Sequence, residues 1–167
     1  MDVKKVYFDV LTPVNFLIRS AEVYPDKVAV VHSDKRYTYK EFYQRVNRLA
    51  GALVKKGIGK GDKVAFLCPN TPHTLEAHNA VPMIGAALVA INIRLSSREI
   101  AYIINHSDAK VLFVDNEFAD VIKPIRNELT KVDTIVNICD ISDERPLDGL
   151  EYEEFLATGS EAPVDIA

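Results

Sequence analysis

Apolar and polar residues follow two different patterns along the central part of this chain. Short runs rich in Val, Ile, Leu and Phe are separated by longer segments in which apolar residues recur every three or four positions. The runs are typical of buried strands, and the longer segments are typical of amphipathic helices. The predicted strands are 63–68, 87–92, 110–115 and 133–138, and the predicted helices are 71–86, 96–107 and 117–129. Buried strands joined by helices indicate an α/β fold with a doubly wound, mainly parallel sheet that carries helices on both faces.

Two smaller elements precede this block. Thr12 and Pro13 form an N-cap followed by a proline at the first helical position, and the apolar spacing that follows predicts a helix from Pro13 to about Tyr24. Two short β-prone runs, at 28–32 and 36–39, are separated by polar residues and predict a small hairpin.

Capping signals fix two helix starts. Thr38 and Glu41 stand three residues apart as a capping box, and Ser96 and Glu99 repeat this arrangement. The first of these helices is expected to stop at Gly57, because glycine readily takes the left-handed conformation that ends a helix.

Two prolines and an acidic C-terminal segment modify the predicted helices and loops. Pro82 and Pro124 lie inside two of the predicted helices, so each is expected to kink its helix or to remove a hydrogen bond. Beyond Asp140 the sequence is acidic and loop-like, with one short helix predicted at 151–157. Residues 158–167 are interpreted as an unanchored linker, which leaves 1–157 as one α/β unit.

Composition narrows the classes of function. The chain has 167 residues, of which 48% are hydrophobic and 26% charged, as expected for a globular domain. Lys and Arg number 20 against 24 Asp and Glu, and no basic stripe is present, so nucleic acid is not an expected partner. No apolar run approaches the roughly 20 residues that span a bilayer, and the N-terminus lacks the features of a signal peptide. We therefore expect no membrane span and a cytoplasmic location, with Cys68 and Cys139 as buried free thiols.

Two clusters suggest a binding site but have simpler explanations. The glycines of "GIGKGD" at 57–62 follow a predicted helix and precede a strand, whereas a phosphate loop follows a strand and opens a helix. We interpret this segment as a helix stop and a turn. His73 and His78 are five residues apart and do not share a helix face, so no shared metal is expected, and His73 with Glu76 is interpreted as a surface pair. His32 and His106 lie beside turns and are expected to be solvated.

A binding site of the sheet itself would lie outside the carboxyl ends of its strands. Thr71 and Arg94 follow two of these ends and are the candidates for an anion site. Thr71 is also explained as a helix N-cap, and Arg94 as a surface or interface ion-pair residue, and we prefer these structural explanations. No residue is assigned as catalytic, as cofactor-binding or as a metal ligand.

The order of four segments identifies a family resemblance. These segments are "YTYKEF", "GIGKGDKVAFLCPNTP", "GAALVAINIRLSSREIAYIINHS" and "AKVLFVD". In this order and spacing they resemble the N-terminal region of adenylate-forming (AMP-binding) enzymes, and most of all acyl-CoA synthetases that act on fatty acids. The resemblance extends from about Val14 to Ala167.

This resemblance implies an activity for a longer parent protein. Members of the family activate a carboxylic acid with ATP and Mg²⁺, form an acyl-adenylate and pyrophosphate, and transfer the acyl group to coenzyme A. The family's phosphate loop, its later adenine, ribose and magnesium segments and its catalytic Lys have no counterpart in these 167 residues. We therefore expect an inactive fragment, with 1–157 as a partial subdomain and 158–167 leading toward the phosphate loop.

The expected partners are the remainder of the parent chain, its small-molecule substrates and, in some members, a second copy. The near alternative is a fragment of an aryl-CoA ligase. The alternative from another class is a stand-alone doubly wound module that binds a small anion.

Overall fold

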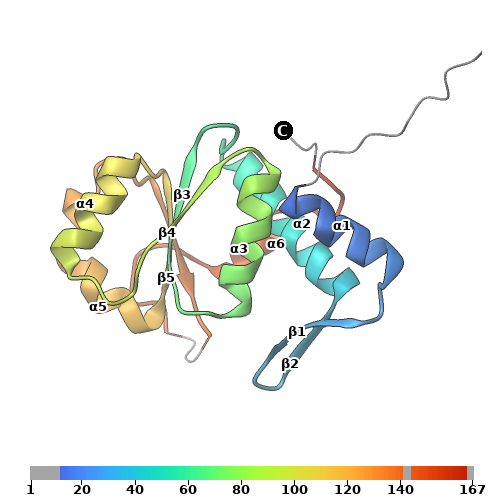
Figure 1. Ribbon diagram of the computed structural model, residues 1–167. Helices are drawn as coiled ribbons and strands as arrows, with labels where there is room; N and C mark the ends of the chain where they lie inside the picture. Colours follow the sequence, from blue (N-terminus) through green and yellow to red (C-terminus); the bar gives the residue numbers. More distant parts are fainter. Residues whose placement is uncertain (1–11, 141–143, 165–167) are drawn as a thin grey trace, which may run out of the picture.

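A five-stranded parallel sheet forms the centre of the molecule (Figure 1). The computed structural model describes residues 12–140 and 144–164. The strand order is β4-β3-β5-β6-β7, and all neighbouring pairs are parallel. The strands are β3 (Lys63–Leu67), β4 (Ala87–Ala90), β5 (Val111–Asp115), β6 (Thr134–Ile138) and β7 (Leu150–Glu151). The predicted strands are confirmed, and the two-residue strand β7 is an addition that sequence periodicity did not indicate.

Helices cover both faces of this sheet, which confirms the doubly wound architecture. In Figure 1, α4 and α5 lie on one face, and α3, α6, α2 and α1 lie on the other. The helices are α1 (Pro13–Val23), α2 (Tyr39–Lys55), α3 (Pro72–Met83), α4 (Ser97–Ser107), α5 (Ala119–Ile122) and α6 (Tyr152–Ala157).

The side chains of each central strand alternate between two cores. In β3, Val64 and Phe66 pack under α2 and α3, whereas Ala65 and Leu67 pack on the opposite face of the sheet. Phe66 stacks on Phe113 of β5, with 4.3 Å between the ring centroids. Because successive strand residues point to opposite faces, near-continuous apolar runs are required in strands that helices cover on both sides.

Local signals determine where the helices begin and end. Both predicted capping boxes form: Glu41 accepts a hydrogen bond from the backbone N–H of Thr38 at 2.8 Å, and Glu99 accepts one from Ser96 at 2.9 Å. Helix α2 ends before Gly57, which has a φ of +78°. The segment 57–62 is therefore a helix stop and a turn, as expected.

Proline breaks one predicted helix more severely than expected. The segment 117–129 forms the single turn α5 between two 3₁₀ segments, η1 (Asn116–Phe118) and η2 (Lys123–Glu128). Pro124 lies in η2, where its missing N–H and fixed φ are tolerated near the start of a short segment. Pro82, by contrast, lies near the end of α3, which continues to Met83.

The hairpin formed by β1 (Val28–His32) and β2 (Lys35–Thr38) confirms the prediction for this region. It is fixed to the sheet by Asp140, which follows β6: its carboxylate lies 2.8 Å from His32 Nε2 and 3.1 Å from Lys35 Nζ. Burial raises the pKa of Asp140, but the hydrogen bonds with His32 and Lys35 outweigh this and keep it below its usual range. The expectation that His32 is solvated is only partly correct, because its side chain is 29% exposed and pairs with Asp140, which lies 108 residues away in the sequence.

Residues 158–164 lie against α2, so the expectation of an unanchored segment is wrong for this part. Lys55 donates a hydrogen bond to the carbonyl of Thr158, and Arg48 pairs with Glu161. A Cβ at Gly159 would overlap the backbone carbonyl of Arg48, so the chain passes the helix at a distance that only glycine permits. The expected boundary near residue 157 stays a prediction.

Candidate functional site

The loops after β3 and β5 meet at the carboxyl edge of the sheet, where the chain order reverses. The chain leaves β3 for β4 on one side and returns to β5 on the other, which is the arrangement that opens a crevice in doubly wound sheets. Cys68 follows β3, and its Sγ lies 3.3 Å from Thr71 Oγ1 and 3.8 Å from Asp115 Oδ2 at the end of β5. This crevice is therefore a candidate binding site.

Thr71 occupies the N-cap position of α3, but its hydroxyl does not cap the helix. It lies 3.1 Å from Nδ1 of His73, which is only 6% exposed. Burial lowers the pKa of His73 to about 4, so the imidazole is neutral near pH 7. The predicted N-cap position is confirmed, whereas the hydroxyl is already engaged inside the protein.

A buried polar network begins beside His73 and joins three helices. Arg45 of α2 donates one hydrogen bond to Glu76 of α3 and another to Glu153 of α6, both at 2.6 Å. Tyr152 of α6 donates to the second carboxylate oxygen of Glu76, also at 2.6 Å. Glu76 and Tyr152 are fully buried, so the predicted surface pair between His73 and Glu76 is wrong.

The charges of this network are set by burial and pairing together. Burial raises the pKa of Glu76. Burial and the nearby charge of Glu76 both raise the pKa of Tyr152. Burial lowers the pKa of Arg45, but hydrogen bonds and charges of Glu153 and Glu76 outweigh this effect and raise it above its usual range. Burial also raises the pKa of Cys68 to about 11. Neither Tyr152 nor Cys68 is therefore an activated nucleophile at neutral pH.

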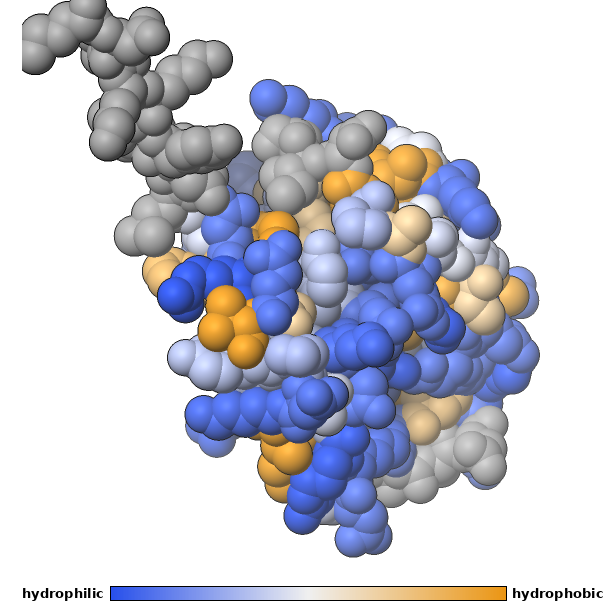
Figure 2. Space-filling model, turned by 90° about the vertical axis from the view of Figure 1, so that its right-hand side faces the viewer, coloured by the Kyte–Doolittle hydropathy of each residue, from blue (hydrophilic) through white to orange (hydrophobic). Residues whose placement is uncertain are grey.

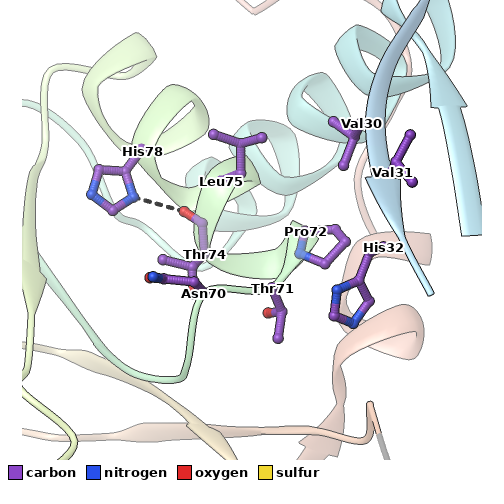
Figure 3. A pocket seen from close by; sticks show the side chains of 9 residues that line it. All are labelled: Val30, Val31, His32, Asn70, Thr71, Pro72, Thr74, Leu75 and His78. Carbon is purple, nitrogen blue, oxygen red and sulfur yellow. Dashed lines mark hydrogen bonds between the residues drawn. The ribbon is translucent and has the colours of Figure 1, made fainter.

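A pocket of about 470 Å³ lies between the hairpin and the first turns of α3. Figure 3 shows Val30, Val31 and His32 of β1 on one side, and Thr71 and Leu75 on the other. Its lining is mostly apolar, and the remaining residues that line it are Asn70, Pro72, Thr74 and His78.

The two candidates for an anion site do not converge on this pocket. Thr71 lines it, whereas Arg94 does not. Arg94 is exposed after β4, its backbone N–H donates to Asn92 Oδ1 at 3.0 Å, and its guanidinium makes no ion pair with any other described residue. Anion binding by this pair stays a prediction.

The described residues do not fit a complete site for ATP or Mg²⁺. The loop between β3 and α3 carries no glycine that would let its backbone wrap a phosphate, and its Thr71 hydroxyl is engaged. Within 12–140 and 144–164, no three His, Cys, Asp or Glu side chains are grouped so that they could hold a metal ion. We therefore derive no chemical step through these groups on this chain.

Three further expectations concern the cysteines, the exposed histidine and the surface. Neither Cys68 nor Cys139 forms a disulfide, and both are only partly buried. His106 is exposed and its ring stacks on that of Tyr102. The face that carries α1, α2 and the hairpin is largely hydrophilic, with apolar side chains in separate small areas (Figure 2). None of the helices in the described ranges combines the length and apolarity needed to cross a membrane.

Several residues of the site were not predicted from the sequence. Sequence patterns assign no role to Arg45, Tyr152 or Asp140. Their partners lie 31, 76 and 108 residues away, and no local spacing signals such contacts.

Comparison with known proteins identifies relatives that are CoA ligases. A 4-hydroxybutyrate–CoA ligase of Metallosphaera sedula is 40% identical over 164 residues, which cover 96% of this chain and 30% of that protein. An acetate/butyrate–CoA ligase of Arabidopsis thaliana, named as peroxisomal, is 39% identical over 91% of this chain and 29% of its own length. The chain thus spans about 30% of the length of these curated relatives.

A solved structure and a family model agree with these relatives. The crystal structure of an anthranilate CoA ligase in complex with anthranoyl-AMP matches with a TM-score of 0.87 at 25% identity, over 100% of this chain and 31% of that chain. The family model described as AMP-binding enzyme matches residues 17–165. This match covers most of the chain, and the chain belongs to the family of AMP-binding enzymes.

Proposed function

We propose that this chain is the N-terminal scaffold of a longer acid–CoA ligase. The enzyme would convert a carboxylic acid, ATP and coenzyme A into an acyl-CoA, AMP and pyrophosphate through an acyl-adenylate. The observation that carries the proposal is the family match over residues 17–165, in a chain that spans about 30% of its relatives.

The buried network is the main contribution of the chain to such an enzyme. Arg45, Glu76 and Tyr152 hold α2, α3 and α6 together on one face of the sheet. A buried ion pair with an added hydrogen bond favours one arrangement of these helices, because breaking it leaves an uncompensated buried charge. The network therefore gives the rest of the protein a rigid surface against which to form its pockets.

We propose fatty acids as the substrate class, beginning with short chains. Two of the curated relatives are named for 4-hydroxybutyrate and for acetate and butyrate, which are short aliphatic acids. An aryl acid is the second candidate, supported by the anthranilate ligase whose structure matches this chain throughout. The sequence-based expectations of a cytoplasmic location and of a homodimer stay predictions, to be checked by cell fractionation and by light scattering.

The test is acyl-CoA formation by the full product of the reading frame that encodes this chain. Acetate, butyrate, octanoate, palmitate and benzoate are offered separately with ATP, Mg²⁺ and coenzyme A, and thioester formation is followed by mass spectrometry. The proposal predicts turnover of the aliphatic series with a preference for its short members. A preference for benzoate selects the aryl alternative, and no thioester from any acid contradicts the proposed function.

A further inference from the structure

Among the described residues, neither outer edge of the hairpin pairs with another strand. Within residues 12–140 and 144–164, strand β1 pairs only with β2, in a two-stranded antiparallel sheet. In such a pair, every second residue turns its N–H and C=O away from its partner. Among the described residues, no other element donates a hydrogen bond to the backbone of 28–32 or accepts one from it. The outer edge of β1 is therefore open to an additional strand.

An apolar groove runs along this open edge. Val30, Val31 and His32 are consecutive, and all three line the pocket of about 470 Å³ (Figure 3). Because successive strand residues point to opposite faces, a pocket that touches three in a row lies beside the strand rather than on one of its faces. The opposite wall is formed by Pro72 and Leu75 of α3. The groove is thus wide enough to receive side chains and has apolar walls on both sides.

The edge also lacks the features that normally protect exposed strands. Natural proteins place Lys, other charges or Pro on such edges to prevent pairing. Strand β2 contains Lys35 and Arg36, whereas β1 has the sequence VAVVH, without a Lys, Arg, Asp, Glu or Pro. Val31 is 60% exposed and Leu75 is 44% exposed. This asymmetry makes the edge of β1, rather than that of β2, the better candidate for an added strand.

The hairpin is held in a fixed position for such a contact. Asp140 joins both His32 and Lys35 to the end of β6, which restrains the hairpin relative to the sheet. A strand that joins this edge does not have to order the groove first, which lowers the entropic cost of docking.

We propose that an extended segment of the same polypeptide, from the part that follows residue 167, adds to the open edge of β1 as a third strand. Its apolar side chains would fill the groove between β1 and α3, in the manner of β-strand addition. This inference rests on the proposed function, because the existence of additional polypeptide is inferred from relatives that are about three times as long as this chain. The segment is recognised by its chemistry: extended, with apolar residues at every second position.

The test compares hydrogen exchange in the 167-residue chain and in the full product of the reading frame. Amides of 28–32 are expected to exchange at least tenfold more slowly in the full product, while those of the core strand β5 are protected in both. Equal exchange of 28–32 in the two proteins overturns the proposal. Protection already present in the 167-residue chain, together with a dimeric mass, assigns the edge to a second copy and overturns it as well.

A pair of matched variants keeps the proposal testable even if the 167-residue chain does not fold alone. Val31→Lys places a charge in the groove, whereas Val28→Lys changes a residue of the same strand that is 49% exposed and does not line the pocket. In the full product, Val31→Lys is expected to speed exchange of 28–32 at least tenfold, and Val28→Lys to leave it unchanged. Equal effects of the two variants overturn the proposal.

Acyl-CoA formation, measured on the same preparations, separates this inference from the proposed function. An active enzyme with an unprotected β1 edge overturns the strand addition alone. A protected edge in an inactive protein overturns the proposed function alone.

Discussion

Replacing Tyr152 with Phe isolates one hydrogen bond of the buried network. The side chain is 0% exposed, and its hydroxyl donates to Glu76 Oε2 at 2.6 Å. Its ring packs edge-on against His73, with 4.7 Å between the centroids, and against Phe113, with 5.9 Å. Phenylalanine retains these ring contacts, so the substitution removes the hydroxyl and little else.

The expected cost follows from the charge and burial of the acceptor. A hydrogen bond to a charged group contributes about 1.5–3 kcal/mol, and the carboxylate that loses its donor stays buried beside Arg45. For a domain of this length, each kcal/mol lowers Tm by about 2–4 °C. We therefore expect Tyr152→Phe to lower Tm by roughly 3–12 °C.

Urea unfolding of the 167-residue chain measures this cost, with Tyr102→Phe as the matched control. Tyr102 is 67% exposed, so the control should stay within about 0.5 kcal/mol of the parent. If Tyr152→Phe also stays within that range, the hydroxyl does not stabilise the helices and the argument for a rigid network fails.

Three further predictions test other parts of the structure. Because the pKa of His73 is about 4 when folded and about 6.5 when unfolded, the unfolded state binds more protons between these values, and stability falls as pH decreases from about 6.5 to 4. In urea titrations at several pH values, His73→Phe should remove roughly 3 kcal/mol of this pH dependence of the free energy of unfolding. An unchanged dependence on pH would refute the prediction. Gly159→Ala should lower the free energy of unfolding by about 1–3 kcal/mol and expose 158–164 to limited proteolysis, because its Cβ would overlap the backbone of Arg48. The control Gly59→Ala meets open space and should be neutral. Equal behaviour of the two variants would contradict the docking of 158–164 on α2. Cys68, whose pKa burial raises to about 11, should be alkylated at pH 8 on the order of 100-fold more slowly than in the urea-unfolded chain, and equal rates would show that it is accessible.

Local signals predicted those parts of the fold that depend on neighbouring residues. The capping boxes at Thr38 and Ser96 each involve residues three apart, and both helices begin where these boxes place them. The left-handed stop at Gly57 is equally local. Strand alternation and burial could be predicted for the same reason, since each depends on a pattern within a few residues.

Contacts between segments that are distant in the sequence could not be predicted from local patterns. The sequence of its own helix predicts Glu76 as a surface residue. Its burial is possible because Arg45 and Tyr152, which are 31 and 76 residues away in the sequence, donate hydrogen bonds to its carboxylate. The placement of Gly159 likewise depends on the surface of α2, which the sequence of the segment itself does not reveal. A site at the carboxyl edge therefore stays a prediction, and most of the polar contacts found there were not predicted.

Pyrophosphate release tests the central claim most directly. The full product of the reading frame and the 167-residue chain are each incubated with ATP, Mg²⁺ and butyrate, without coenzyme A, so that only adenylate formation is measured. We expect release by the full product and none by the 167-residue chain, which acts as a scaffold. Release by the 167-residue chain alone would contradict this claim, because it would place the chemistry on residues assigned here to structure.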